Sequence, residues 1–316
     1  MKAAVHRRLG GREVLQIGES ARPGLKTDEI LIAVHATTLR TADHRSGRRS
    51  VLGMDVAGVV EAIGHDVDGF EPGNEVVAMS GSRPGRHADY VIVKATEAVA
   101  RMPRNLGFDE AASIVFGGIT AQAYLNQVTV QRGTTVLVNG ASGAVGSALV
   151  QMARAVGARV TGVCSAANEQ MVTGLRTKRT IDYAIHDFIA DGFTYDVIID
   201  CVGNAPVDRV HASVNAGGAV LLVAVGLRSL LSAKRDARRY GITVVTGPGP
   251  YRAEDLKYVM FLAEEGDLRP VVDRTFPVED TPAAHRYVDL GRERGSVVIH
   301  VAESAHPVTQ HHASWT

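Results

Sequence analysis

The chain has 316 residues, which is more than one hydrophobic core usually holds and enough for two domains. Hydrophobic residues make up 45% of the sequence and charged residues 22%, values that are typical of a globular enzyme. The formal net charge is zero, so the overall charge favours neither a nucleic acid nor an anionic membrane as a partner.

Residues 1–115 predict an irregular, mostly antiparallel β domain. Short apolar or alternating runs are separated by turn residues, as in the cluster Asp66–Asn74. The runs that predict strands are Glu29–Val34, Val56–Ile63, Glu75–Ala78 and Tyr90–Val93.

After about residue 120, predicted strands and helices alternate, which indicates a parallel, doubly wound sheet in an α/β protein. The apolar run Val136–Asn139 is followed by apolar residues at helical spacing, at Val145, Leu149, Met152 and Val156. Further strands are predicted at Arg159–Cys164, Tyr195–Cys201, Ala219–Val225 and Ile242–Thr246.

The C-terminal part of the chain has a third pattern. Leu256–Glu265 predicts a helix, and a second helix is predicted at Thr281–Leu290. This second helix lies between predicted strands at Val271–Phe276 and Val297–Val301. We expect these elements to rejoin the first domain.

Basic residues cluster at two places, Arg45–Arg49 and Arg235–Arg239. We interpret the first cluster as a solvated loop and the second as a solvated helix face, because most charge runs are of this kind. Neither cluster changes the expectation that the chain binds no nucleic acid and no membrane.

Cysteine content and the N-terminal segment bear on location. Cys164 and Cys201 are the only cysteines, and we expect both to be reduced residues at the ends of buried strands. Such low cysteine content fits a reducing cytoplasm, and two cysteines cannot form a four-cysteine zinc site. The N-terminus lacks the apolar stretch of a signal peptide, and no segment reaches the apolar length of a membrane span. We therefore expect a cytoplasmic protein.

The glycine-rich segment Gly140–Gly146 joins the first strand of the predicted parallel sheet to the next helix. Its glycines allow a tight turn and let a pyrophosphate approach without Cβ atoms in the way. The helix begins near Ala144, so its free N–H groups and positive dipole end face the phosphates. The spacing is G-x-x-G-x-x-G rather than G-x-G-x-x-G, but the flanking elements favour dinucleotide binding over a purely structural turn.

The end of the second strand of this sheet is where dinucleotide enzymes contact the adenosine ribose. NAD enzymes place Asp or Glu there, whereas this chain has the sequence Val163–Ala166. No carboxylate at that strand end repels a 2′-phosphate, and Ser165 could donate a hydrogen bond to it. Asn168, Lys178 and Arg179 could assist if the following loop folds back. The sequence therefore favours NADPH over NADH.

With these features the sequence resembles the medium-chain dehydrogenase/reductase superfamily, in its zinc-independent quinone oxidoreductase and enoyl reductase branch. Besides the glycine turn, the segments that carry the resemblance are Leu52–Gly64, Gly69–Val76, Ala111–Ala121, Ile181–Tyr183 and Asp196–Gly203. The resemblance implies a GroES-like catalytic domain formed by residues 1–115 and 268–316. It also implies a Rossmann NADP(H)-binding domain at residues 116–267, with the active site in the cleft.

Zinc-dependent members of this superfamily carry a Cys shortly before an Asp in the first domain and a His in a Gly-His-Glu triplet. Here the matching residues are Arg40, before Asp43, and Met54. Neither is a plausible zinc ligand, so we expect no metal site. Without zinc, the expected chemistry is hydride delivery from NADPH to a quinone or an α,β-unsaturated carbonyl, with negative charge developing on oxygen.

The resemblance also implies the positions of cofactor-binding residues. It places Thr120 near the nicotinamide, the N–H groups of Ala144 and Val145 on the pyrophosphate, and Tyr183 on the adenosine phosphate side. Two later strand ends border the cofactor. The complete predicted set is Thr120, Gly140, Ser142, Gly143, Ala144, Val145, Gly146, Ser165, Asn168, Tyr183, Val202, Gly203, Val225 and Gly226.

Predicted catalytic residues are Arg40, Asp43 and Thr120. Arg40 departs from the Asn or Tyr of many relatives. It could stabilise an enolate, bind a substrate carboxylate, or pair with Asp43, and Asp43 could instead be an acceptor that supports the fold. The loop Arg45–Ser50 is shorter than usual, which favours an open cleft.

The favoured function is an NADPH-dependent reductase of quinones or enones, with a small-molecule electrophile as partner. One alternative is a specialised biosynthetic reductase acting on a polyketide-like or acyl-carrier intermediate. Another is a protein that binds the cofactor without reducing a substrate, such as a regulator or a cyclase-like descendant. Ile242–Thr246 is a candidate edge strand, and in relatives such a strand pairs with its copy, so we expect a homodimer.

Overall fold

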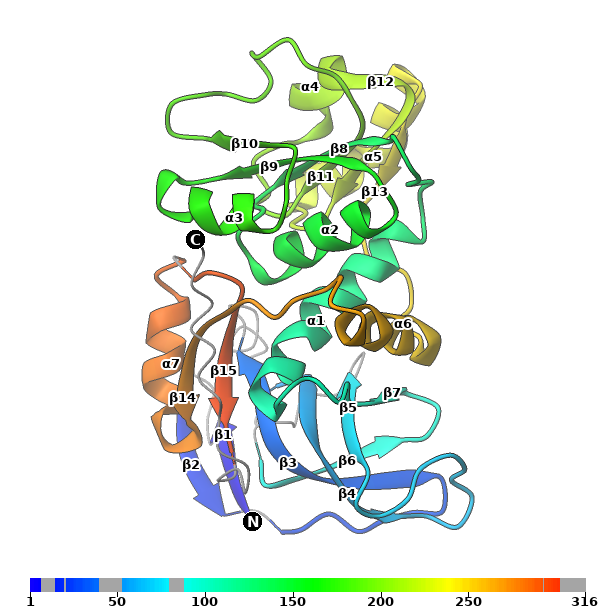
Figure 1. Cartoon of the computed structure of the whole chain (residues 1–316), viewed down its shortest axis with the longest axis vertical. Helices are drawn as coiled ribbons and strands as arrows, with labels where there is room; N and C mark the ends of the chain where they lie inside the picture. Colours follow the sequence, from blue (N-terminus) through cyan, green and yellow to red (C-terminus); the bar gives the residue numbers. More distant parts are fainter. Residues whose placement is uncertain (7–14, 20, 40–52, 80–87, 292, 302–316) are drawn as a thin grey trace. The chain divides into compact units, whose positions relative to one another are not determined.

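The computed structural model of the protein describes residues 1–6, 15–19, 21–39, 53–79, 88–291 and 293–301 (Figure 1). These residues form two compact units. The first unit draws on the described residues of Met1–Ile119 and of 251–301, and the second on Thr120–Pro250. A seven-stranded sheet organises the first unit and a six-stranded parallel sheet the second, which confirms the predicted α/β class.

The sheet of the first unit has the order β14-β15-β3-β4-β5-β7, with β6 also paired to β3. All its pairings are antiparallel except that of β14 with β15. Alternate β-branched residues such as Ile32, Val60 and Val76 are buried together and form the core of this unit. The strands are β3 (Glu29–Leu39), β4 (Asp55–Ile63), β5 (Glu75–Met79), β6 (Tyr90–Lys94), β7 (Ala98–Arg101), β14 (Val272–Pro277) and β15 (Ser296–His300).

A buried carboxyl group joins the end of β3 to the start of β4. Asp55 is completely buried, and its Oδ2 accepts a hydrogen bond of 2.6 Å from the Thr38 hydroxyl. Its Oδ1 accepts one of 3.0 Å from the Thr38 N–H, and the Thr37 hydroxyl donates to the Asp55 carbonyl at 2.7 Å. These bonds satisfy polar groups that burial would otherwise penalise, so they hold the two strand ends together.

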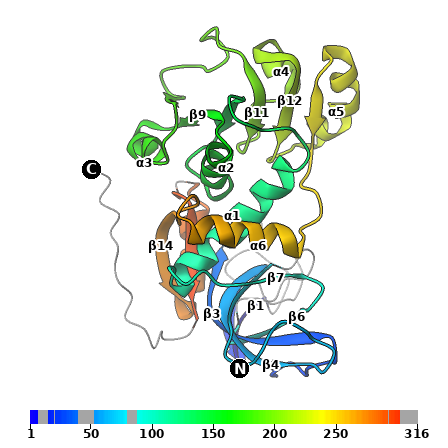
Figure 2. The ribbon, with the colours of Figure 1, turned by 45° about the vertical axis from the view of Figure 1, so that its right-hand side comes forward.

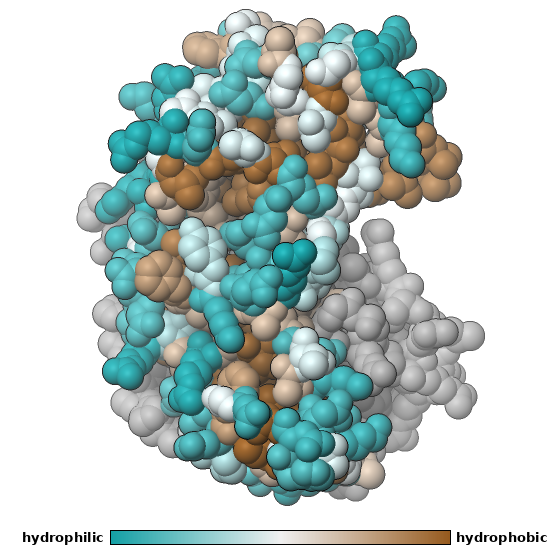
Figure 3. Space-filling view, turned by 90° about the vertical axis from the view of Figure 1, so that its right-hand side faces the viewer, coloured by the Kyte–Doolittle hydropathy of each residue, from teal (hydrophilic) through white to brown (hydrophobic). Residues whose placement is uncertain are grey.

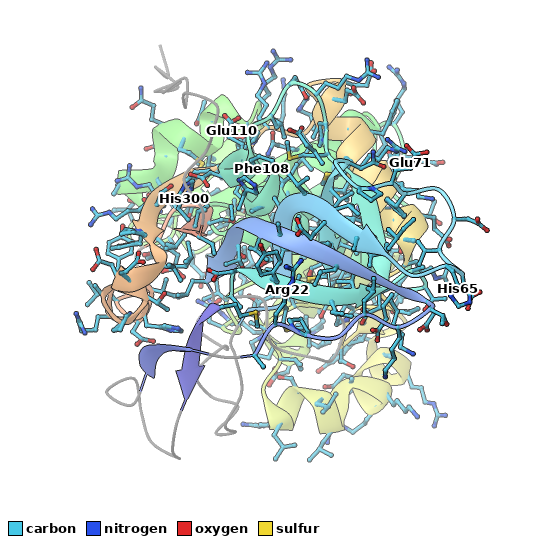
Figure 4. All side chains as sticks on the ribbon, turned by 90° about the horizontal axis from the view of Figure 1, so that it is seen from below. Arg22, His65, Glu71, Phe108, Glu110 and His300 are labelled. Atoms are coloured by element: carbon cyan, nitrogen blue, oxygen red, sulfur yellow. The ribbon has the colours of Figure 1, made fainter. Side chains whose placement is uncertain are left out.

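Helix α1 (Phe108–Leu125) begins in the first unit and ends in the second. Its first turn is fixed to the sheet by two contacts, which lie around the labels Phe108 and His300 in Figure 4. The His35 ring stacks on Phe108 with centroids 4.1 Å apart, and His300 Nδ1 lies 3.0 Å from Asp109 Oδ1. Burial lowers the pKa of His35, and the neighbouring His300 lowers it further, so the stacked ring favours its neutral form.

Three further elements complete the first unit. Helix α6 (Ala253–Glu264) packs against β7, and Asn105 Nδ2 donates to the Ala263 carbonyl at 3.1 Å. Helix α7 (Thr281–Val288) packs against β14 and β15. Strands β1 (Lys2–His6) and β2 (Leu15–Glu19) form a separate antiparallel pair.

The second unit is a parallel sheet in the order β10-β9-β8-β11-β12-β13. The chain first runs from β8 through β9 to β10, and then continues from β11 on the other side of β8. The order therefore reverses between β8 and β11, whose central residues Leu137 and Ile198 are completely buried. The strands are β8 (Thr135–Asn139), β9 (Arg159–Cys164), β10 (Arg179–Asp182), β11 (Tyr195–Asp200), β12 (Val214–Leu222) and β13 (Thr243–Val245).

The helices of this unit follow its strands, as Figure 2 shows. Gly157 follows α2 with a positive φ of 84° and leads into β9, and Gly241 caps α5 in the left-handed conformation before β13. These are α2 (Ala144–Ala155), α3 (Glu169–Gly174), α4 (Val207–Val210) and α5 (Leu227–Tyr240).

Most predicted elements are present, with some shifted boundaries. β12 begins earlier than predicted, at Val214, and ends at Leu222, because its first half is not continuously apolar. The short strands β7 and β10 were not predicted, nor was the β1–β2 pair. β13 lies at the edge of its sheet, as predicted.

Candidate functional site

The glycine turn follows β8 directly and cannot accommodate side chains at two of its positions. Gly140 has a positive φ of 83°, and a Cβ atom there would lie 2.8 Å from Val202 Cγ2. A Cβ atom at Gly146 would collide with the Gly140 carbonyl oxygen. The Gly143 N–H closes the turn by donating to that same oxygen at 3.2 Å. Glycine is therefore required by the local packing of the chain itself.

The outer side of the turn is open. Helix α2 begins at Ala144 with Gly143 as its N-cap, and no side chain caps it. A Cβ atom at Gly143 would meet only the Gly140 oxygen, at 3.7 Å. The first N–H groups of a helix, here those of Ala144, Val145 and Gly146, have no acceptor within it. Together with the helix dipole they fit a phosphate group.

Asp200 at the end of β11 organises the neighbouring loop. Its side chain is 1% exposed, and Oδ1 accepts a hydrogen bond of 2.9 Å from Asn139 Nδ2 at the end of β8. The same oxygen accepts from the N–H groups of Val202 and Gly203, each at 3.0 Å. Oδ2 accepts from the Ala205 N–H at 2.9 Å. One carboxyl group thus fixes the loop after β11 against the glycine turn.

The loop after β11 also contacts the loop after β12. Gly203 has a positive φ of 91°, and a Cβ atom there would lie 3.1 Å from the Ala224 oxygen. The Ala224 N–H donates to the Asp200 carbonyl at 3.2 Å. Val225 packs against the core, and Gly226 is the N-cap of α5 with open space where a Cβ atom would lie. The predicted residues at these two strand ends therefore lie side by side.

Four predicted residues surround the end of β9. Asn168 Nδ2 donates to Ser142 Oγ at 3.0 Å, which links this strand end to the glycine turn. The Asn168 N–H donates to the Ser165 carbonyl at 2.9 Å. The Tyr183 N–H donates to the Cys164 carbonyl at 3.1 Å, and the Tyr183 side chain is 63% exposed.

Lys178 and Arg179 do not join this group. They lie at the start of β10, which runs parallel to β9 with Arg179 opposite Thr161. Arg179 Nη1 binds Asp191 Oδ2 at 2.7 Å, and its guanidinium lies over the Phe193 ring. These contacts contradict the prediction that Arg179 assists Ser165, because Arg179 lies opposite Thr161, three residues before the end of β9, and is bound to Asp191. Lys178 precedes Arg179 and lies further from that strand end.

Two carboxyl groups that sequence reasoning missed lie near Ser165. Asp182, the last residue of β10, pairs in register with Cys164, and Glu169 begins α3. Burial, followed by the charges of Glu169 and Asp182, raises the pKa of the Cys164 thiol to about 11. The strand end itself has no acid, but its immediate surroundings are acidic. Only the pairing of β9 with β10 reveals the position of Asp182.

Thr120 occupies the part of α1 that belongs to the second unit and is 3% exposed. One helical turn later, the Tyr124 hydroxyl donates to the Leu222 carbonyl at 3.0 Å, at the end of β12. Residues four apart share a helix face, so Thr120 lies on the side of α1 that faces this strand end. Arg40 and Asp43 lie outside the described residues.

In the part of the chain that the structure describes, no three His, Cys, Asp or Glu side chains form a group suited to a metal ion. Met54, at one of the two positions that match zinc ligands, is half-buried just before β4. None of the helices formed by the described residues is long and apolar enough to cross a membrane.

A parallel sheet with a glycine turn at its reversal point, joined to a β-rich unit, is the architecture of a two-domain oxidoreductase with a nicotinamide cofactor. Comparison with known proteins agrees. Residues 26–104 match the alcohol dehydrogenase GroES-like domain, and residues 175–299 match the zinc-binding dehydrogenase family.

Relatives match along nearly the whole chain. 2-Methylene-furan-3-one reductase of Solanum lycopersicum is 30% identical over 95% of this chain and 79% of its own length. Quinone oxidoreductase of Homo sapiens is 31% identical over 90% and 92%. The quinone oxidoreductase structure from Coxiella burnetii superposes with a TM-score of 0.87 at 26% identity, over 96% and 99% of the two chains. The chain belongs to the medium-chain dehydrogenase/reductase superfamily, in its quinone oxidoreductase branch, as predicted.

Alanine substitutions at two glycines of the turn should separate folding from binding. Gly146→Ala forces a Cβ atom against the Gly140 oxygen, so we expect it to lower the free energy of unfolding by about 1–3 kcal/mol. Gly143→Ala has room for its methyl group and should lose less than about 1 kcal/mol, the cost of a poorer N-cap. Its dinucleotide affinity should nevertheless fall, because the methyl group occupies the approach to the N–H groups. Urea unfolding and fluorescence titration measure the two effects, and equal stability losses would contradict this account.

Asp200→Asn should loosen the loop after β11. In asparagine an NH2 group replaces one carboxylate oxygen and cannot accept a hydrogen bond. Either the Ala205 N–H or the N–H groups of Val202 and Gly203 then lose their acceptor. A buried donor is left unsatisfied at a cost of about 1–3 kcal/mol. We expect a lower urea midpoint and weaker dinucleotide binding. Asp208→Asn, at an exposed position of α4, is the matched control and should change neither. Wild-type affinity in Asp200→Asn would show that the loop does not border the cofactor.

Proposed function

We propose that the protein is an NADPH-dependent, metal-free oxidoreductase that delivers hydride to a quinone or an α,β-unsaturated carbonyl. The observation that carries this proposal is the meeting of the glycine turn with the loop after β11 at the reversal point of the sheet. Open parallel sheets bind their ligands at such a point, outside the carboxyl ends of the strands. Relatives named as quinone oxidoreductases and a furanone reductase support the substrate class.

The described residues fit a dinucleotide. The open side of the turn at Gly143 offers backbone N–H groups to the pyrophosphate. Ser142, Ser165, Asn168 and Tyr183, around the end of β9, would hold the adenosine half. Residues at the ends of β11 and β12 would border the nicotinamide half, namely Val202, Gly203, Val225 and Gly226.

When bound, the reduced cofactor supplies the hydride. The chain has to orient the nicotinamide ring, exclude water, and offer donors to the substrate oxygen on which charge develops. We propose that Thr120 orients the nicotinamide, since it lies on the face of α1 that meets the end of β12. Arg40 would stabilise the developing oxyanion, with Asp43 positioning it; both assignments are carried by the sequence.

The donor set at the positions of the zinc ligands does not suit zinc. One position is Arg40, a cation without an available lone pair, and the other is Met54, a thioether. The adjacent Asp55 is already engaged by Thr37 and Thr38. We therefore propose that protein donors, and not a metal ion, stabilise the charge that develops on the substrate oxygen.

Two further proposals concern assembly and location. β13 is an edge strand of the second unit's sheet, and pairing with its copy in a second chain would satisfy its unpaired backbone groups. We propose a homodimer formed in this way. The cytoplasmic location rests on sequence features such as the low cysteine content and stays a prediction.

A substrate panel tests the proposed activity. NADPH oxidation, followed by absorbance, should occur with quinones and simple enones. Turnover confined to enones carried on an acyl-carrier thioester would assign the chain to a specialised biosynthetic reductase. Tight NADPH binding without turnover on any of these substrates would overturn the reductase proposal and indicate a cofactor-binding protein that does not reduce.

Coenzyme preference should depend on Ser165. Ser165→Asp places a carboxylate at the end of β9, where it repels a 2′-phosphate, so the ratio of NADPH to NADH affinity should fall at least about tenfold, or 1.4 kcal/mol. Glu169→Gln removes a nearby charge and should shift the ratio the other way. Thr173→Asp, on the exposed side of α3, is the control and should leave it unchanged. An unaltered ratio in Ser165→Asp would disprove the role of Ser165.

A further inference from the structure

Helix α5 exposes leucines and cations along one face. Leu227, Leu230 and Leu231, in its first two turns, are 73%, 49% and 76% exposed. Lys234 and Arg238 follow in the next two turns and are also exposed. At 3.6 residues per turn, Leu227, Leu231, Lys234 and Arg238 lie on one line along the helix. This line forms the outer face of α5.

The inner face of α5 is fully used by packing. Ala233 and Asp236 are buried, and the helix packs against β13 and α4. Asp236 is the only acid of the helix, and Arg235 Nε binds its Oδ1 at 3.2 Å. Hydrogen bonding from Ser232, followed by that from Arg235, lowers the pKa of Asp236, so its charge is held on the inner side. The outer face therefore has cations without a balancing carboxylate on the same helix.

The surface view agrees with this description. α5 lies at the periphery of the second unit in Figure 2, and hydrophobic and hydrophilic surface adjoin at that edge in Figure 3. Isolated exposed leucines are common, and cations near a helix C-terminus stabilise its dipole. Three leucines within two turns, continued by cations on the same line, exceed what these two effects explain. The balanced charge of the whole chain hides this local excess.

We propose that the outer face of α5 docks on an anionic lipid surface. The leucines would enter the boundary between headgroups and acyl chains, and Lys234 and Arg238 would contact lipid phosphates. A second copy of the chain fits this face less well, because in a two-fold contact the face meets itself and offers no carboxylate to Lys234 and Arg238. Nucleic acid fits less well because it offers no apolar surface to the leucines. This inference does not depend on the proposed reductase activity.

Vesicle flotation of the full chain tests the proposal. The wild-type protein should float with vesicles of equimolar phosphatidylcholine and phosphatidylglycerol, and not with phosphatidylcholine alone. Raised salt should release it, since the contribution of the cations is screened. Two double variants should each lower partitioning at least about tenfold: Leu230→Gln/Leu231→Gln and Lys234→Gln/Arg238→Gln. For the second variant this follows from roughly fivefold for each cation. Two independent pairs keep the test valid if one of them folds poorly.

The control variant is Ile185→Gln/Arg132→Gln. Both residues are exposed in the same unit and neither belongs to α5, so flotation should match the wild type. Absence of wild-type flotation with the anionic vesicles would overturn the proposal, as would wild-type partitioning of both α5 variants. Light scattering adds a further check. A dimer that becomes monomeric in Leu230→Gln/Leu231→Gln would show instead that a second copy covers this face.

Discussion

The hydrogen bond between Asn139 and Asp200 joins the two strand ends at which the order of the parallel sheet reverses. Strands on either side of this point are followed by connections to opposite flanks of the sheet, so the loops after β8 and β11 separate from each other. Without a restraint, the loops themselves could move into the space between them. Asp200 limits their freedom by binding backbone N–H groups of its own loop while it accepts from Asn139. The shape of the candidate site depends on this one buried carboxyl group.

Local sequence signals predicted much of this arrangement. The glycine turn is recognisable because Gly140 and Gly146 have no room for side chains, so the sequence must have glycine at these positions. Strands of the parallel sheet are recognisable because they are buried on both faces and read as continuous apolar runs. The superfamily resemblance added the order of the domains and the positions at later strand ends.

What the sequence could not predict is non-local. Asp200 and Asn139 are 61 residues apart, and their contact follows from the pairing of β8 with β11. Asp182 lies near Ser165 only because β10 runs parallel to β9 in a particular register. The same register carries Arg179 away from that strand end. Short strands such as β10 have few residues and little periodicity, so the pairing that decides these positions has no clear local signal.

Net charge is a poor guide to the surface of this chain for a related reason. The numbers of acidic and basic residues are equal, yet acids gather near the end of β9 and cations on α5. The acids lie around the end of β9, and the cations lie on α5, the helix that follows β12. The N-cap of α5 is Gly226, which would also border the cofactor. A helix that rests on lipid through Leu227 would therefore hold the loop after β12 close to the lipid as well. Apolar quinones partition into lipid. Docking would therefore bring the end of the sheet at which we propose the reduction close to the lipid that holds the quinone.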